Sequence, residues 1–147
     1  MPLNAVLGRR IFGEPLVTPA DFVKTIYLGD RGCKGIFINA WEERIEVWVD
    51  DISRIRGESW DFYTDEDIPD GRIVFSGARS VRFDPPGPIP NDYIHSLSVV
   101  EDEEGWRFTL SVASVESGGA RAQVAIEIGA SSIHLEDPRR PGEKIYT

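Results

Sequence analysis

The chain has 147 residues, of which 41% are hydrophobic and 28% charged, and its formal net charge at pH 7 is −9. This length suits one domain with a sizeable core, and the composition argues against an intrinsically disordered chain. The negative charge disfavours nucleic acid and anionic membrane surfaces as partners. It would favour a basic protein partner or a cation, but acidic charge that serves solubility alone is the stronger interpretation, because the charges are spread over several loops.

Cys33 is the only cysteine, so no intramolecular disulfide can form. No apolar run approaches the ~18 residues of a membrane span, and residues 1–12 have no signal-peptide core. We therefore expect a soluble cytoplasmic protein. We expect a single domain over residues 1–147, with an irregular lead-in (1–17) and a polar tail (138–147).

A helix is predicted to begin at Thr18-Pro19-Ala20-Asp21. Threonine can cap a helix, proline suits its first position, and an acid in the first turn interacts favourably with the helix dipole. The helix is expected to run for about ten residues, to end at Gly29 and to bury Phe22 and Ile26 against a sheet.

From Lys34 onward the chain reads as strands. The first covers residues 36–40, and residues 41–43 are predicted to connect it to a second strand as a hairpin. In that second strand Ile45, Val47 and Val49 form one apolar face. Trp48 lies on the opposite, polar parity, which makes it the best candidate for an exposed or interface aromatic side chain.

Residues 53–71 are interpreted as a long irregular connection that contains an acidic cluster. The next apolar parity is interrupted at Gly77, where we expect a bulge or bend. Residues 84–90 contain four prolines, which lack the backbone donor that a sheet interior needs, so they are predicted to form an extended connector.

The C-terminal half shows uninterrupted two-residue alternation in two segments. Strand side chains point to opposite faces in turn, so each segment predicts an antiparallel strand with one buried face. We therefore expect a mainly β fold, as a curved sheet, a sandwich or an open barrel of about seven or eight strands with one short N-terminal helix. The alternating apolar residues are Trp106, Phe108, Leu110, Val112, Ala122, Val124, Ile126 and Ile128.

Motifs for chemistry are weak. The acidic loop 65–71 suggests a calcium site, but its glycine is seventh instead of sixth and Ser76 stands where an EF-hand has glutamate, so a solvated turn is favoured. Cys33, His95 and His134 are too scattered in sequence to indicate a metal site. No nucleophile-elbow or phosphate-loop motif occurs. The sequence thus favours a non-enzymatic protein with no catalytic residues, no metal and no cofactor.

Five segments resemble a bacterial family of small uncharacterised proteins, a domain of unknown function. The resemblance covers most of the chain after the lead-in and implies no activity or catalytic residue. In size and composition the chain is also similar to small acidic β-rich immunity proteins that act against bacterial toxins. The segments are YLGDRGCK (27–34), ISRI (52–55), FYTDEDI (62–68), PPGPIPND (85–92) and HLEDP (134–138).

The leading hypothesis is a protein-binding module, immunity-like or adaptor, that contacts a protein partner through a strand face. One alternative is a small-molecule binder or enzyme that uses the interior of a curved sheet, and another is a self-associating structural protein or homodimer. Aromatic and arginine side chains are enriched at protein interfaces. The candidate binding residues are Asp30, Arg31, Trp48, Arg54, Trp60, Asp65, Asp67 and Arg79.

Overall fold

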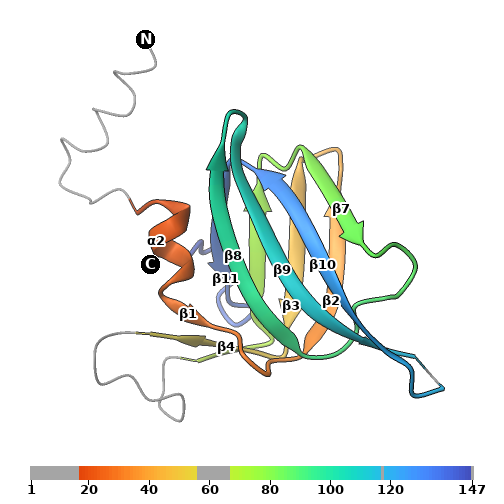
Figure 1. Ribbon diagram of the computed structural model, residues 1–147. Helices are drawn as coiled ribbons and strands as arrows, with labels where there is room; N and C mark the ends of the chain where they lie inside the picture. The colour runs from red at the N-terminus through yellow and green to blue at the C-terminus, as the bar shows by residue number, and fades with distance from the viewer. Residues whose placement is uncertain (1–16, 56–66, 117, 147) are drawn as a thin grey trace, which may run out of the picture.

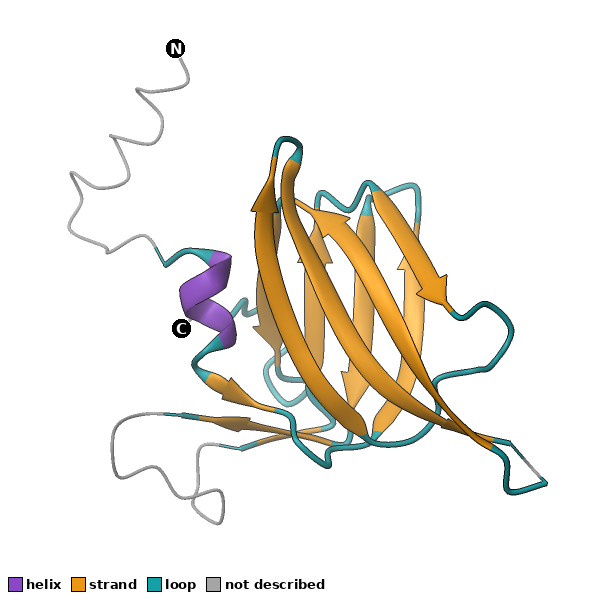
Figure 2. Ribbon diagram, in the orientation of Figure 1, coloured by secondary structure: helices purple, strands orange, loops and turns teal. Residues whose placement is uncertain are grey.

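The computed structural model describes residues 17–55, 67–116 and 118–146, and these form antiparallel β-sheets preceded by one short helix (Figure 1; Figure 2). The predicted mainly β fold class is confirmed. In chain order the elements are α2 (Pro19–Val23), β1 (Ile26–Tyr27), β2 (Cys33–Asn39), β3 (Arg44–Val49), β4 (Asp51–Arg54), β5 (Ile68–Pro69), β6 (Arg72–Ser76), β7 (Ser80–Asp84), β8 (Ile94–Asp102), β9 (Gly105–Val115), β10 (Arg121–Ala130) and β11 (Ser132–Glu136).

Two four-stranded sheets lie face to face and form the body of the domain (Figure 1). One sheet has the strand order β7-β10-β9-β8, and the other has the order β11-β6-β3-β2. A smaller sheet, β1-β4-β5, lies at the lower end of this body in the view of Figure 1. Of the curved sheet, sandwich and open barrel that the sequence left open, the described residues form a sandwich.

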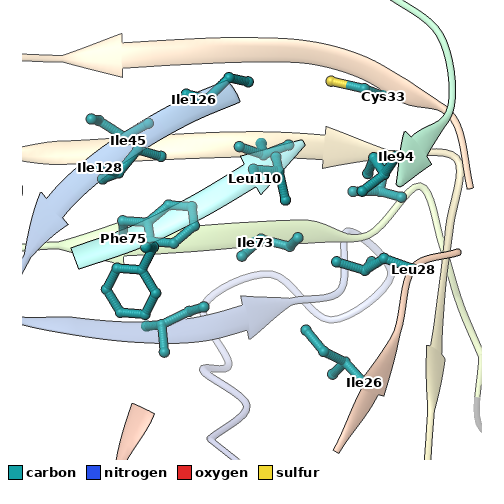
Figure 3. Packing of buried hydrophobic residues seen from close by; sticks show 14 of the residues in the cluster. Ile26, Leu28, Cys33, Ile45, Ile73, Phe75, Ile94, Leu110, Ile126 and Ile128 are labelled. Carbon is teal, nitrogen blue, oxygen red and sulfur yellow. The ribbon is translucent and has the colours of Figure 1, made fainter. Parts of the chain in front are cut away.

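The core fills the space between the two large sheets (Figure 3). Phe75 from one sheet and Phe108 from the other meet with their ring centroids 5.0 Å apart. The alternation predicted for the C-terminal strands is confirmed, because Leu110 on β9 and Ile126 on β10 are paired and fully buried. Each such side chain contributes about 1.5–3 kcal/mol by leaving water.

The chain crosses between the sheets at two adjacent points. Gly77 lies between β6 and β7 with φ of 63°, and Ser131 lies between β10 and β11. A Cβ atom on Gly77 would lie 2.6 Å from the Ser131 hydroxyl, so both the backbone angle and the available space favour glycine here. The bend predicted at Gly77 is confirmed.

Helix α2 begins where the sequence predicts, and the Thr18 hydroxyl accepts a hydrogen bond from the Asp21 N–H at 3.1 Å. The prediction that the helix continues to Gly29 is wrong, because α2 has five residues and Ile26–Tyr27 form β1. These two residues favour strands, and their partner β4 is distant in sequence, so local signals did not reveal the pairing. Within the described ranges, no helix has the length and apolarity needed to cross a membrane.

The segment after β11 returns to the sheet. Leu135 and Ile145 exchange two backbone hydrogen bonds, of 2.8 and 2.9 Å, and Ile145 packs against the core. The next residue, Tyr146, places its ring centroid 5.4 Å from that of His134. Part of the segment interpreted from the sequence as a polar tail therefore helps to cover the outer face of β11.

Candidate binding surface

Among the described residues, the largest concentration of exposed apolar side chains lies at the edge formed by β2. Phe37 is 46% exposed on one face of this strand, Ile38 is 53% exposed on the other, and Trp41 in the following turn is 95% exposed. In the described part of the chain, β2 is one of the two terminal strands of its sheet. Proteins usually protect such an edge with charged side chains or prolines. From Ile36 to the end of β2 there is neither.

A groove of about 900 Å³ borders this edge. Ile36 and Ile38 of β2 line one side, and the proline segment that links β7 to β8 (residues 86–90) lines the other. Phe83 of β7 and the 71% exposed Ile89 add further apolar surface. The lining of the groove is therefore dominated by apolar side chains.

One end of the groove is closed by the chain itself. The Cys33 N–H donates to the Asp92 carbonyl at 2.9 Å, and Gly32 forms an antiparallel bridge with Tyr93. The Asp50 carboxylate accepts a hydrogen bond from the Gly32 N–H at 2.9 Å, so Asp50 and Asp92 both lie at this end. Two carboxylates thus adjoin the start of the β2 edge.

On the outer face of the same sheet, Trp48 is half-buried between two side chains from neighbouring strands. Its ring centroid lies 4.2 Å from that of Phe37, and the Arg72 guanidinium carbon lies 4.2 Å from the Trp48 ring. The indole Nε1 donates a hydrogen bond of 2.9 Å to Glu46. These contacts hold Trp48 in one orientation beside the exposed Phe37.

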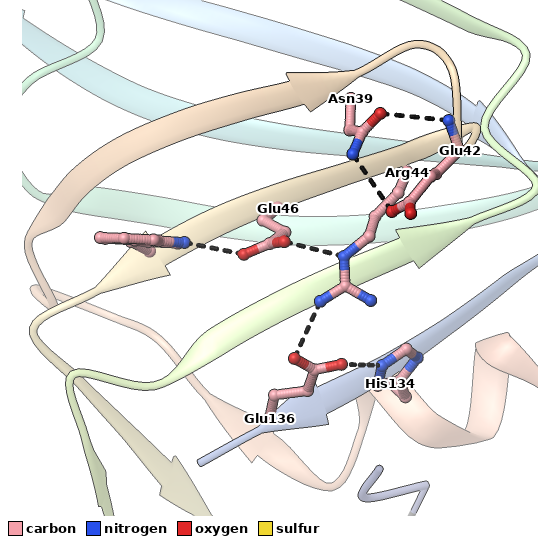
Figure 4. Close-up of polar contacts among 7 residues, drawn as sticks. Asn39, Glu42, Arg44, Glu46, His134 and Glu136 are labelled. Atoms are coloured by element: carbon pink, nitrogen blue, oxygen red, sulfur yellow. Dashed lines mark hydrogen bonds and ion pairs between the residues drawn. The ribbon is translucent and has the colours of Figure 1, made fainter. Parts of the chain in front are cut away.

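A chain of polar contacts continues from Glu46 across the sheet (Figure 4). Arg44 on β3 donates to Glu46 at 2.7 Å and, across β6, to Glu136 on β11 at 2.8 Å. The second Glu136 oxygen lies 2.8 Å from His134 Nε2. This outer-face network joins β3 to β11 and fixes the side chains around Trp48.

The two glutamates in this network are held as carboxylates. Burial alone would raise their pKa values, but hydrogen bonds from Trp48 and Arg44 lower the pKa of Glu46. Bonds from Arg44 and His134 likewise lower the pKa of Glu136. Burial lowers the pKa of His134 against the opposing effect of Glu136, and His134 is 1% exposed with no partner for Nδ1 in the described part of the structure.

Cys33 is 5% exposed, and burial raises the pKa of its thiol to about 11, although a backbone hydrogen bond from Gly35 opposes the shift. The thiolate, which is the nucleophilic form, is therefore scarce at neutral pH. The interpretation of Cys33 as a buried residue at the start of a strand agrees with its position in β2. Its chemistry gives no support to cysteine-based catalysis.

Two of the predicted site residues, Arg31 and Asp67, meet around Asp51. The Arg31 guanidinium lies 4.0 Å from the Asp51 carboxylate and also donates to the Ser53 hydroxyl. Burial raises the pKa of Asp51, the hydrogen bond and charge of Asp67 raise it further, and Arg31 opposes the shift. This arrangement beside β4 and β5 is a partly exposed carboxyl pair balanced by a cation.

The other predicted residues lie apart. Arg79 donates to Asp102 and Glu104, at 3.3 Å each, and to the Trp106 carbonyl, so it ties the β8–β9 hairpin to the start of β7. Arg54 lies on β4 opposite Ile26, and Asp30 lies in an exposed turn with φ of 61°. Trp60 and Asp65 fall outside the described residues. The structure therefore does not gather the eight candidates into one site.

The acidic loop 65–71 lies partly outside the described residues. Only its last residues, from Asp67 onward, belong to the described ranges. Within those ranges, no group of three or more His, Cys, Asp and Glu side chains has the proximity to hold a metal ion.

Sequence reasoning missed Phe37, Ile38 and Trp41 as surface residues. A signal was present, because Ile36-Phe37-Ile38 is apolar at three consecutive positions in a chain whose other strands mostly alternate. Such a run is typical of a strand buried on both faces. At the end of a sheet, the same run instead leaves apolar side chains exposed on both sides of the strand.

Comparison with known proteins places the chain in a family without assigning an activity. No curated protein and no solved structure matches it. A family model described as a family of unknown function (DUF6258) matches residues 17–147, which is most of the chain and includes every described residue up to Tyr146. The chain belongs to this family of unknown function, DUF6258.

Proposed function

We propose that this domain is a non-enzymatic protein-binding module, adaptor or immunity-like, and that its partner contacts the β2 edge. The observation that carries the proposal is an unprotected apolar edge strand beside an apolar groove. Edge strands offer unpaired backbone groups, and apolar surface beside them adds the driving force for association. Phe37 and Trp41 belong to the residue types enriched in protein interfaces.

The neighbouring outer face supports the same assignment. Trp48 is held by Phe37, Arg72 and Glu46, so an interface that includes it would lose little side-chain entropy on binding. Trp and Arg are the residue types that most often dominate binding energy in protein interfaces. We place Trp48 at the margin of the proposed surface, next to the more exposed Phe37.

A paired-variant experiment tests this function. Wild-type protein, Ile38→Lys and Val100→Lys would each be immobilised, and partners would be captured from a lysate of the source cells. Val100 is the matched control because it is 60% exposed on β8, the terminal strand of the other sheet. We expect a partner that binds wild type and Val100→Lys but not Ile38→Lys.

Two results would overturn the proposal. One is a partner that all three proteins retain equally, and the other is no partner with any of them at physiological protein concentration. Circular dichroism of each variant would first establish that the fold is intact. Ile38 is more than half exposed, so we expect Ile38→Lys to change stability by no more than about 0.5 kcal/mol.

A small-molecule site is the second candidate, because a groove of about 900 Å³ is within the size range of ligand pockets. The space between the large sheets is occupied by core side chains, so such a ligand would use the groove at the β2 edge. Ligand pockets are lined mainly by apolar side chains and also contain a few polar groups that converge on the ligand. Here the acidic residues Asp50 and Asp92 lie together at one end of an otherwise mainly apolar groove, which supports the protein-binding proposal more than a small-molecule site.

A further inference from the structure

The β2 edge already has an antiparallel neighbour at its first residues. The Asp92 carbonyl accepts a hydrogen bond from the Cys33 N–H, and Tyr93 bridges to Gly32. On the far side of that bridge the chain runs back through Pro90, Pro88 and Pro86, which have no N–H to donate. The pairing of this segment with β2 therefore stops at Cys33, and the groove begins at that point.

The remaining edge has the length and surroundings of a strand acceptor. Among the described residues, β2 from Lys34 to Asn39 has a strand neighbour only on its β3 side. Alternate residues of an edge strand direct their N–H and C=O groups outward, where an extended peptide can bond to them. Every second side chain of such a peptide would enter the groove toward Ile36, Phe83 and Ile89.

The charges around the groove indicate which kind of partner it can bind. Within the described ranges, Asp50 and Asp92 have no ion-pair partner, whereas Lys34 lies 2.6 Å from Asp70 and is thus balanced. The whole chain carries a formal charge of −9. A guest with Lys or Arg side chains would be attracted both by the two local carboxylates and by the overall field.

A second copy of the chain is less suited to bind at the β2 edge. Two protomers would each bring a charge of −9, and the β2 segment from residue 35 to residue 39 contains no cation to offset it. Like-charge surfaces repel each other at moderate ionic strength. The electrostatics therefore favour a different, basic partner over self-association.

We infer that the groove between β2 and the proline segment 86–90 receives an extended peptide segment of a partner protein, with alternating apolar and basic side chains, which pairs with β2 as an added strand. This inference rests on the proposed protein-binding function and specifies the class of partner. The apolar residues of the peptide occupy the groove, and the basic residue at the end of the peptide nearest Gly32 lies beside Asp50 and Asp92, while its other basic residues face away from the groove and respond to the overall negative charge.

Synthetic peptides of about eight residues provide the test. The probe alternates Lys and Val, a second peptide replaces every Lys by Glu, and a third carries N-methyl groups on alternate backbone nitrogens of the Lys–Val sequence. Titration calorimetry with the full chain would give each affinity, and amide hydrogen exchange would locate the contact. We expect the Lys–Val peptide to bind, to slow exchange in β2, and to bind at least about tenfold more tightly than either control peptide.

Charge variants distinguish the contribution of Asp50 and Asp92 to peptide affinity from that of the overall negative charge. The double variant Asp50→Asn with Asp92→Asn should weaken binding by about threefold or more, while Glu101→Gln, an exposed carboxylate on β8, should change it less. Asparagine at position 50 keeps an oxygen that can accept from the Gly32 N–H. About 1 M NaCl should also weaken binding, because screening then acts within about 3 Å.

Equal binding of the Lys–Val and Glu–Val peptides would overturn the assigned charge, and equal binding of the N-methylated peptide would overturn strand addition. No binding by the Lys–Val peptide would overturn this inference while leaving the capture experiment with Ile38→Lys to decide the broader function. Protection of β2 in the absence of peptide, lost in Ile38→Lys, would identify a second copy as the occupant and also overturn it.

Discussion

His134 is a titratable side chain enclosed on the outer face of a sheet. Burial lowers its pKa, the charges of Arg44 and Lys144 act in the same direction, and Glu136 opposes them. In the unfolded chain a histidine takes up a proton near pH 6.5. The unfolded state therefore binds more protons than the folded state as pH falls through about 6.5, and stability falls with it.

This linkage predicts a pH-dependent free energy of unfolding that His134→Gln weakens. Urea titrations at about pH 7.5 and pH 5 should show a loss of stability in wild type and a smaller loss in the variant. Glu46 and Glu136 have lowered pKa values, so their contributions are lost mainly at more acidic pH. An unchanged dependence in His134→Gln would refute the assignment.

Trp48 and Trp41 differ in what they contact. Trp48 has ring or cation contacts on two sides, whereas Trp41 is 95% exposed. Trp48→Ala should therefore lower the free energy of unfolding by about 1–3 kcal/mol, which is less than for a fully buried tryptophan. Trp41→Ala should change it by no more than about 0.5 kcal/mol. Thermal melts of both variants test this difference, and equal melting temperatures would contradict it.

At the scale of elements, the predictions that succeeded depended on side-chain periodicity within one segment. The parity of Ile45, Val47 and Val49 identified the inner face of β3, and Trp48 lies on the other face as predicted. The failure at Ile26–Tyr27 has a physical reason. A two-residue strand exists only because β4 lies beside it, and no local pattern specifies that neighbour.

The connection from β6 to β7, where the chain crosses between the two large sheets, allows a prediction about stability. Gly77→Ala should destabilise the fold by more than about 1 kcal/mol, because a Cβ at positive φ is strained and would also meet Ser131. Gly118→Ala is the control, since nothing lies within 4 Å of its added Cβ. Chemical denaturation measures both. A loss in Gly118→Ala as large as in Gly77→Ala would argue against a specific role for the crossing.

For the whole molecule, the candidate surface could be predicted less well than the fold. Arg31, Trp48 and Arg79 were selected for their residue types, yet they belong to three separate groups of contacts. Composition indicates which side chains can form an interface, but the order of strands in a sheet decides which ones adjoin. The exposed edge follows from β2 being terminal, which depends on pairings between segments far apart in the chain.

The same order of strands and the overall charge together predict how the protein associates. The β2 edge is apolar from Ile36 to Ile38, so we expect mutual repulsion between chains of charge −9 to keep the protein monomeric at neutral pH. Near the sequence pI of about 4.7 this repulsion disappears. Light scattering should therefore show monomers at about pH 7.5 and growing association at about pH 5.

Ile38→Lys should suppress that association, because it places a charge on the edge itself. Val100→Lys adds the same charge and removes a similarly exposed apolar side chain from the opposite sheet, so it should suppress association less. Circular dichroism at about pH 5 would verify that all three proteins remain folded under these conditions. If both variants behaved alike, net charge alone would govern association and the β2 edge would have no special part in it. A difference between them would instead locate the association at the strand where we propose that the partner binds.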